Sequence, residues 1–278
     1  MKVPLFCVAV VCLGAAASGR ARPLPLAPPP REAKERVLSD EAFRAIVREA
    51  NQSFQEPLVK ALTAFPRPVD ASVHYALTRS NALLIALAAQ NRMRAGGDDA
   101  RKLATLRDTA AKLAATIERN PYDLAEVLRL ADLLNRYPDL AADPDARPVP
   151  VRLKDKFTHD DILPLFGNGP AKKGHRMEFH LNRLARQTTF TREDADRIEL
   201  LAYKAALIGE LLRDFDDLVP KSKQNQRGDW LKFAAEVEQN GWRLAETARG
   251  RDPAEMKPVV KKLIAGCTNC HADFRECN

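Results

Sequence analysis

The chain of 278 residues lacks any basic run interleaved with aromatic side chains, and only 6% of its residues are aromatic. Such a run is typical of nucleic-acid-binding surfaces, so we expect no nucleic-acid partner. A catalytic constellation is also missing, because the carboxylates lie among lysines and arginines on helical faces, as on a solvated surface. We therefore expect a protein that is not an enzyme. Its formal net charge of +7 favours acidic partners or an anionic membrane surface.

Long apolar runs are rare too, and the longest lies at the N-terminus. It extends from Val3 to Ala17, after Lys2. This length is below the ~20 residues that a helix needs to span a bilayer. Small residues at 15–19 are typical of a signal-peptide cleavage region. We therefore predict a cleaved signal peptide at 1–19, no integral membrane span, and export to the periplasm or an equivalent compartment.

Proline is concentrated in two stretches, Pro23–Pro30 and Pro138–Pro150. We interpret the first as an extended linker and the second as a domain boundary. Apolar residues make up 45% of the chain, which is enough for real cores. The predicted organisation is a signal peptide at 1–19, a Pro-rich linker at 20–37, a helical bundle at 38–137, a linker and irregular segment at 138–171, and a second helical bundle at 172–278.

Apolar residues at three- and four-residue spacing predict an all-α fold. The expected helices cover about 40–65, 69–94, 98–119, 121–134, 175–187, 192–218, 228–248 and 253–274. Pro57 is expected to kink or split the first of these, and Gly96-Gly97 to end the second. The fourth has an apolar stripe that includes Leu124 and Leu128. Helices joined by short turns predict four-helix bundles.

The two halves of the chain resemble each other. Gly97–Leu134 lines up with Gly228–Cys267, and Asn120-Pro121 corresponds to Asp252-Pro253. We interpret this as two tandem four-helix bundles that arose by duplication. The alternative is a chance alignment of Leu/Ala stripes.

The last part of the second bundle carries the sequence Cys267-Thr268-Asn269-Cys270-His271. C-x-x-C-H is the attachment pattern of haem c, in which both thiols become thioethers and the histidine binds the iron. On a helix, the spacings i,i+3 and i,i+4 place all three side chains on one side. We therefore predict one covalent haem. The first bundle has Asn135, Pro138 and Asp139 at about the corresponding positions, so it cannot bind haem c in this way.

A C-terminal helix that ends Cys267-x-x-Cys270-His271-x-x-Phe274-Arg275 resembles the cytochrome c prime and cytochrome c556 group. The resemblance covers roughly Lys172 to the C-terminus and implies a haem-binding four-helix bundle. It implies that His271 is the proximal iron ligand and that Phe274 and Arg275 lie in the haem environment. For Arg275 the alternative is a solvated arginine of the tail.

The sixth iron ligand is left open between Met177, His180 and no protein ligand. In cytochrome c556-like relatives a methionine of the first helix of the bundle binds iron, whereas in cytochrome c prime the iron stays five-coordinate. The spacing between Arg176 and His180 matches the arginine that the family often has four residues before this position. Met177 is the other candidate, and its alternative is a core methionine.

We expect an exported monohaem cytochrome that transfers electrons to or from an unidentified redox partner protein. An open iron site would instead bind NO or CO, or serve as a haem sensor. A further alternative is an adaptor without haem, in which Cys267, Cys270, His271 and Cys277 bind zinc. Cys277 is left over in an exported chain and could also form an intermolecular disulfide. The oligomeric state is left open.

Overall fold

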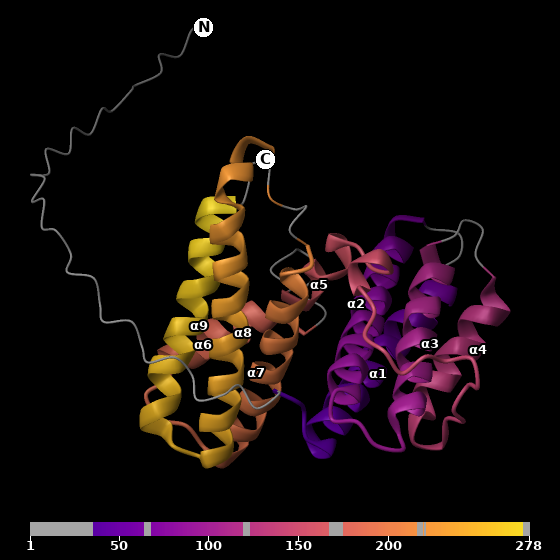
Figure 1. The fold of residues 1–278 in the computed structure, drawn as a ribbon, viewed down its shortest axis with the longest axis horizontal. Helices are drawn as coiled ribbons and strands as arrows, with labels where there is room; N and C mark the ends of the chain where they lie inside the picture. Colours follow the sequence, from indigo (N-terminus) through magenta and orange to yellow (C-terminus); the bar gives the residue numbers. More distant parts are fainter. Residues whose placement is uncertain are drawn as a thin grey trace, which may run out of the picture. The chain divides into compact units, whose positions relative to one another are not determined.

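The structure is a computed structural model that describes residues 36–63, 68–118, 123–166, 175–215, 219 and 221–274, with side chains except at 54–74 and 221. All the regular structure in these ranges is helical, which confirms the all-α class (Figure 1). The α-helices are α1 (Asp40–Thr63), α2 (Pro68–Met93), α3 (Ala100–Glu118), α4 (Leu124–Asn135), α5 (Leu163–Phe166), α6 (Met177–Arg186), α7 (Arg192–Leu212), α8 (Arg227–Gly250) and α9 (Pro253–Phe274).

The two N-terminal predictions, the signal peptide and most of the Pro-rich linker, lie outside the described residues. In the ranges that are described, no helix combines the length and the apolar character needed to cross a membrane.

Local side-chain chemistry explains where several helices begin and end. The Ser39 hydroxyl accepts a hydrogen bond from the backbone N–H of Ala42 at the start of α1, and Asp123 caps α4. Thr191 and Asp194 bond each other's backbone N–H groups at the start of α7. Such caps satisfy N–H groups that the first turn of a helix leaves unpaired. Gly96 has a φ of 68°, a conformation that glycine adopts readily, just after α2 ends.

Two features of the predicted helices differ in part from the structure. Of the two effects expected at Pro57, a split does not occur, because α1 runs through it as one helix. In α4, Leu124 and Leu128 are 45% and 46% exposed, while Leu130 is buried. α4 packs mainly on α3, and therefore it buries one narrow stripe and leaves its outer side chains in solvent.

Each of the first four helices packs against the next, and so do α7, α8 and α9; α6 lies against α9. α7 also contacts α1 and α2. Most buried apolar side chains from Leu38 to Leu263 form one contiguous core, and Val219, Trp230 and Phe274 form a second, smaller cluster. The first four helices and the last four therefore share a core.

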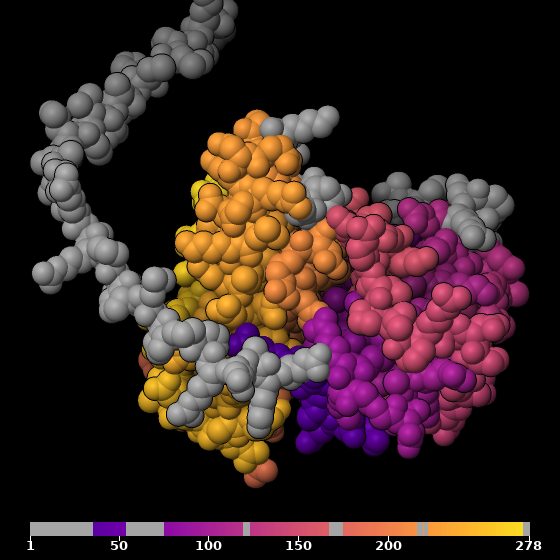
Figure 2. Space-filling view, in the orientation of Figure 1, coloured from indigo at the N-terminus to yellow at the C-terminus, as the bar shows by residue number. Residues whose placement is uncertain are grey.

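The segment that connects them, 138–171, was expected to be a linker and irregular. It contains three short 3-10 turns and α5. Six of its side chains are buried in the core: Leu140, Ala146, Leu153, Phe157, Ile162 and Leu165. In Figure 2 its atoms lie against those of the first helices. The described part of the segment is largely irregular, as predicted, but it packs on the core, because proline spacing does not show that the apolar residues between the prolines are buried.

Two buried arginines hold this connecting segment in place. Arg107 of α3 donates to the carbonyl oxygen of Val149 at 2.6 Å. Arg79 of α2 forms a bidentate pair with the carboxylate of Asp161, at 2.5 and 2.7 Å. Asp161 is 2% exposed, so this pair is shielded from water.

Glycines set the distance between α7 and α8. A Cβ atom at Gly241 would lie 2.6 Å from the backbone nitrogen of Ala206, and one at Gly209 would collide with the backbone of Glu238. Gly241 therefore serves the close packing of α8 on α7. The crossing of α7 and α8 fixes the frame on which α9 lies.

Candidate functional site

The cysteine pair lies in the C-terminal third of α9. Asp252 caps this helix, its carboxylate accepting from the backbone N–H groups of Ala254 and Glu255. The buried stripe of α9 consists of Met256, Val259, Val260, Leu263, Gly266 and Phe274. The helix therefore begins and ends where the sequence predicts, and its apolar side leads to the motif.

The thiols of Cys267 and Cys270 are free and partly buried. Cys267 packs against the main core, whereas Cys270 packs against a second, smaller apolar cluster. Burial is the largest cause that raises the pKa of Cys267 to about 12, with smaller contributions from the charges of Cys270 and Glu178. Burial and Asp273 raise the pKa of Cys270 to about 11. Both sulfurs are therefore protonated at neutral pH.

His271 follows at the next position, and its side chain is exposed. The motif therefore has two sulfurs directed towards apolar side chains and an imidazole that is open to solvent. In a helix these residues are within one turn of each other, as two thioether bonds and an axial ligand to one haem require.

The smaller apolar cluster beside Cys270 is largely aromatic. Trp230 and Phe274 meet edge to face, with ring centroids 5.5 Å apart, and Phe233 lies 6.2 Å from Phe274. The indole N–H of Trp230 donates to the carbonyl oxygen of Leu212 at 2.9 Å, which fixes the ring. We call Trp230, Phe233 and Phe274 the aromatic cluster. Phe274, predicted to lie in a haem environment, therefore belongs to an apolar patch next to a thiol of the motif.

These residues fit a tethered haem better than a bare metal ion. In the part of the chain that the structure describes, no three His, Cys, Asp or Glu side chains gather so that they could hold a metal ion. An apolar aromatic surface beside a sulfur suits a flat organic group. Arg275 and Cys277, predicted as a haem neighbour and a zinc ligand, lie outside the described residues.

The two candidates for the sixth ligand lie on α6. Met177 is fully buried in the main core. His180 is half-buried, and its pKa is lowered first by burial and then by nearby cations, including Lys204 of α7. Glu178 is the α6 residue whose charge acts on Cys267. These positions do not assign an axial ligand, and the sixth ligand stays a prediction.

A buried polar network where α1, α2 and α7 meet the start of α6 was missed by the sequence analysis. Lys204 is 3% exposed, and its ammonium lies 2.5 Å from a carboxylate oxygen of Glu49 and 3.1 Å from Nδ1 of His175. Nε2 of His175 lies 2.8 Å from the amide oxygen of Asn81. The sequence did contain a signal for the buried lysine. Lys204 follows Leu201 by three residues and precedes Ile208 by four, which is the spacing of side chains on one buried side of a helix.

The protonation states in this network follow from its geometry. The Asn81 amide nitrogen donates to the carbonyl oxygen of Leu77, so its oxygen is left to accept from Nε2–H of His175. Nδ1 lies 3.1 Å from both the Lys204 ammonium and a carboxylate oxygen of Glu49, so it accepts from Lys204 when His175 is neutral and donates to Glu49 when His175 is protonated. Burial lowers the pKa of His175 and that of Lys204. Burial would raise the pKa of Glu49, but its contacts with His175 and Lys204 outweigh it and lower the value to about 2.

Comparison with known proteins adds no relative. No protein-family model, curated protein or solved structure matches the chain.

Proposed function

We propose that this protein is an exported monohaem c-type cytochrome that transfers electrons, with haem bound through Cys267 and Cys270 and with His271 as proximal ligand. The observation that carries the proposal is the placement of C-x-x-C-H on α9. Cys267 and Cys270 pack against apolar side chains, and the imidazole of His271 lies within one helical turn of both. We further propose that the second half is related to the cytochrome c prime and c556 group. The chain would then consist of two tandem four-helix bundles, of which the second holds the haem.

The residues of the motif have separable roles. Cys267 and Cys270 would hold the haem, each sulfur through a bond to a vinyl carbon, with the thiol hydrogen taken by the other carbon of that vinyl group. When bound, the haem would supply a one-electron iron couple. The aromatic cluster would exclude water beside Cys270, and a less polar environment favours the less charged, reduced state of the iron.

The last helix of each half begins at an aspartate cap, although the sequence alignment pairs Asp252 with Asn120 rather than with Asp123, so the duplication rests on the sequence. Asp123 caps α4 and Asp252 caps α9, in each case through a carboxylate that accepts backbone N–H bonds. The capped helices follow α3 and α8, which the sequence alignment pairs with each other. Loss of the motif from the first copy would leave a haemless bundle that supports the second.

A five-coordinate site that binds NO or CO is the second candidate. Full burial of Met177 in the core favours it, because that thioether already packs against apolar side chains. Access to an open axial position would then decide the chemistry.

The test is expression with a haem-attachment system, followed by intact-mass measurement and absorption spectra. We expect the mass of one haem on the native chain and none on the Cys267→Ser/Cys270→Ser variant. A low-spin reduced spectrum that CO leaves unchanged supports electron transfer, whereas rapid CO binding supports the second candidate. A native chain without added haem refutes both. The same mass measurement, made on protein from an exporting host, tests cleavage near residues 17–19.

A further inference from the structure

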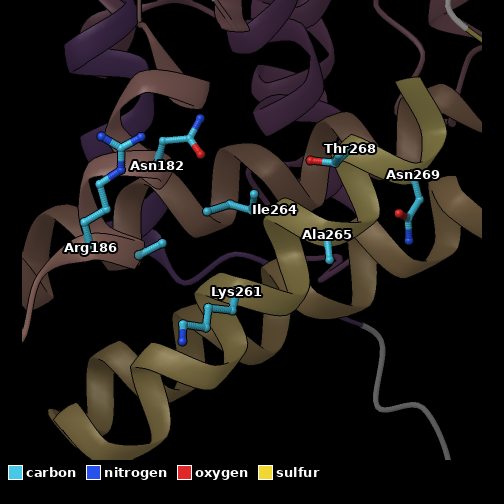
Figure 3. A pocket seen from close by; sticks show the side chains of 8 residues that line it. Asn182, Arg186, Lys261, Ile264, Ala265, Thr268 and Asn269 are labelled. Atoms are coloured by element: carbon cyan, nitrogen blue, oxygen red, sulfur yellow. The ribbon is translucent and has the colours of Figure 1, made fainter. Parts of the chain in front are cut away.

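A shallow groove runs between α6 and α9 beside the motif (Figure 3). Its volume is about 320 Å³, and it is lined by Asn182, Ala185, Arg186, Lys261, Ile264, Ala265, Thr268 and Asn269. Thr268 and Asn269 are the two residues between the cysteines. The groove therefore lies on a side of α9 that is next to the side carrying Cys267 and Cys270.

Charge in this groove has one sign. Arg186 and Lys261 line it from opposite helices, and among the described residues no carboxylate joins them. Neither cation forms an ion pair within the described ranges. Some other cations of the same half are paired, as Arg213 is with Glu238 and Arg249 with Glu199.

More positive charge extends along the exposed side of α9. Lys257 and Lys262 flank Lys261, and neither is paired with a carboxylate in the described part of the chain. The nearest acidic side chain on this helix, Glu255, lies 3.8 Å from Arg243 of α8. Cations without partners attract negative charge over roughly 8 Å at physiological ionic strength.

We propose that this basic groove is the docking site for an acidic surface segment of a partner protein. Asp or Glu side chains of the segment pair with Arg186 and Lys261, its backbone bonds with Asn182, Thr268 and Asn269, and its apolar atoms contact Ile264. A docked segment would lie within one turn of the cysteines. This inference rests on the proposed function only in naming the partner as the redox partner.

The test uses the full chain and a fluorescein-labelled peptide of alternating Asp and Gly, with an Asn–Gly peptide as the neutral probe. The groove variant is Arg186→Glu/Lys261→Glu. Its control, Arg48→Glu/Arg101→Glu, makes the same change in net charge at exposed positions of α1 and α3. Anisotropy titrations measure affinity, and circular dichroism checks that each variant is folded.

We expect the groove variant to bind the acidic peptide at least ~10-fold more weakly than the native chain, and the control variant to stay within about threefold of it. Added salt should weaken binding, and the neutral peptide should not bind. Equal losses in both variants, or no binding to the native chain, would overturn the proposal. So would saturable binding of citrate that displaces the peptide at equal concentration, because it would assign the groove to a small anion.

The same titration on the Cys267→Ser/Cys270→Ser chain separates this inference from the haem proposal. Retained peptide binding without haem supports the groove, whatever the absorption spectrum shows. Loss of peptide binding in the haem-free chain, with the fold intact, counts against a site made by these side chains alone.

Discussion

Replacement of Lys204 by methionine tests whether the buried polar network holds the two halves together. Methionine fills a similar volume but donates no hydrogen bond. The substitution leaves the carboxylate of Glu49 and Nδ1 of His175 without the ammonium that now bridges them. Removing one partner of a buried ion pair costs about 3–5 kcal/mol. The side chain of Glu49 is 37% exposed, and therefore water offsets part of this loss and we expect about 3 kcal/mol.

This cost is large beside the ~5–15 kcal/mol that stabilises a typical protein. For a protein of this size it lowers the melting temperature by roughly 6–12 °C. Urea unfolding followed by far-ultraviolet circular dichroism measures it. Lys262→Met is the matched control, because Lys262 is exposed on α9 and has no partner among the described residues. It should change stability by no more than about 0.5 kcal/mol.

A second substitution makes the test independent of generic damage at the site. Glu49→Gln in the Lys204→Met background removes the stranded carboxylate and supplies an amide that can donate to Nδ1 of His175. The double variant should therefore be less destabilised than the sum of the two single variants, by about 1 kcal/mol or more. If the single costs add, or if Lys204→Met behaves like Lys262→Met, the network does not bind the halves together.

Three further predictions concern the same frame. The lowered pKa of His175 means that the unfolded chain binds a proton that the folded chain resists, so stability should fall as pH drops below the ordinary value of 6.5. The loss is at most ~2 kcal/mol by about pH 5, since one proton is involved. A His175→Gln variant whose urea midpoint changes with pH as much as that of the native chain would contradict the assignment. Gly241→Ala should destabilise by about 1–3 kcal/mol through overpacking against α7, whereas Gly250→Ala, which meets nothing within 4 Å, should be neutral or slightly stabilising in thermal unfolding. Asp161→Asn should cost about 1–3 kcal/mol, because Arg79 loses the charge of its bidentate partner but keeps its ion pair with Glu118, and limited proteolysis should then cut the connecting segment 138–171 faster than in the native chain.

Local chemistry determined much of the fold. Caps such as Ser39 and Thr191, the stop at Gly96-Gly97 and the apolar spacing of α2, α3, α8 and α9 act within one or two turns, so a sequence shows them directly. The same holds for the motif, because a helix places Cys267, Cys270 and His271 on one side whatever surrounds it.

Tertiary structure determined those features that depend on packing between helices. Exposure of Leu124 and Leu128 follows from how few helices cover α4. Burial of the connecting segment follows from Arg79 and Arg107, which find their acceptors tens of residues away in the chain. The positions of Met177 and Lys204 depend on how α6 and α7 meet α1 and α2, and no spacing within one helix specifies such a meeting. Periodicity fixes which side of a helix is apolar, whereas only packing fixes what that side touches.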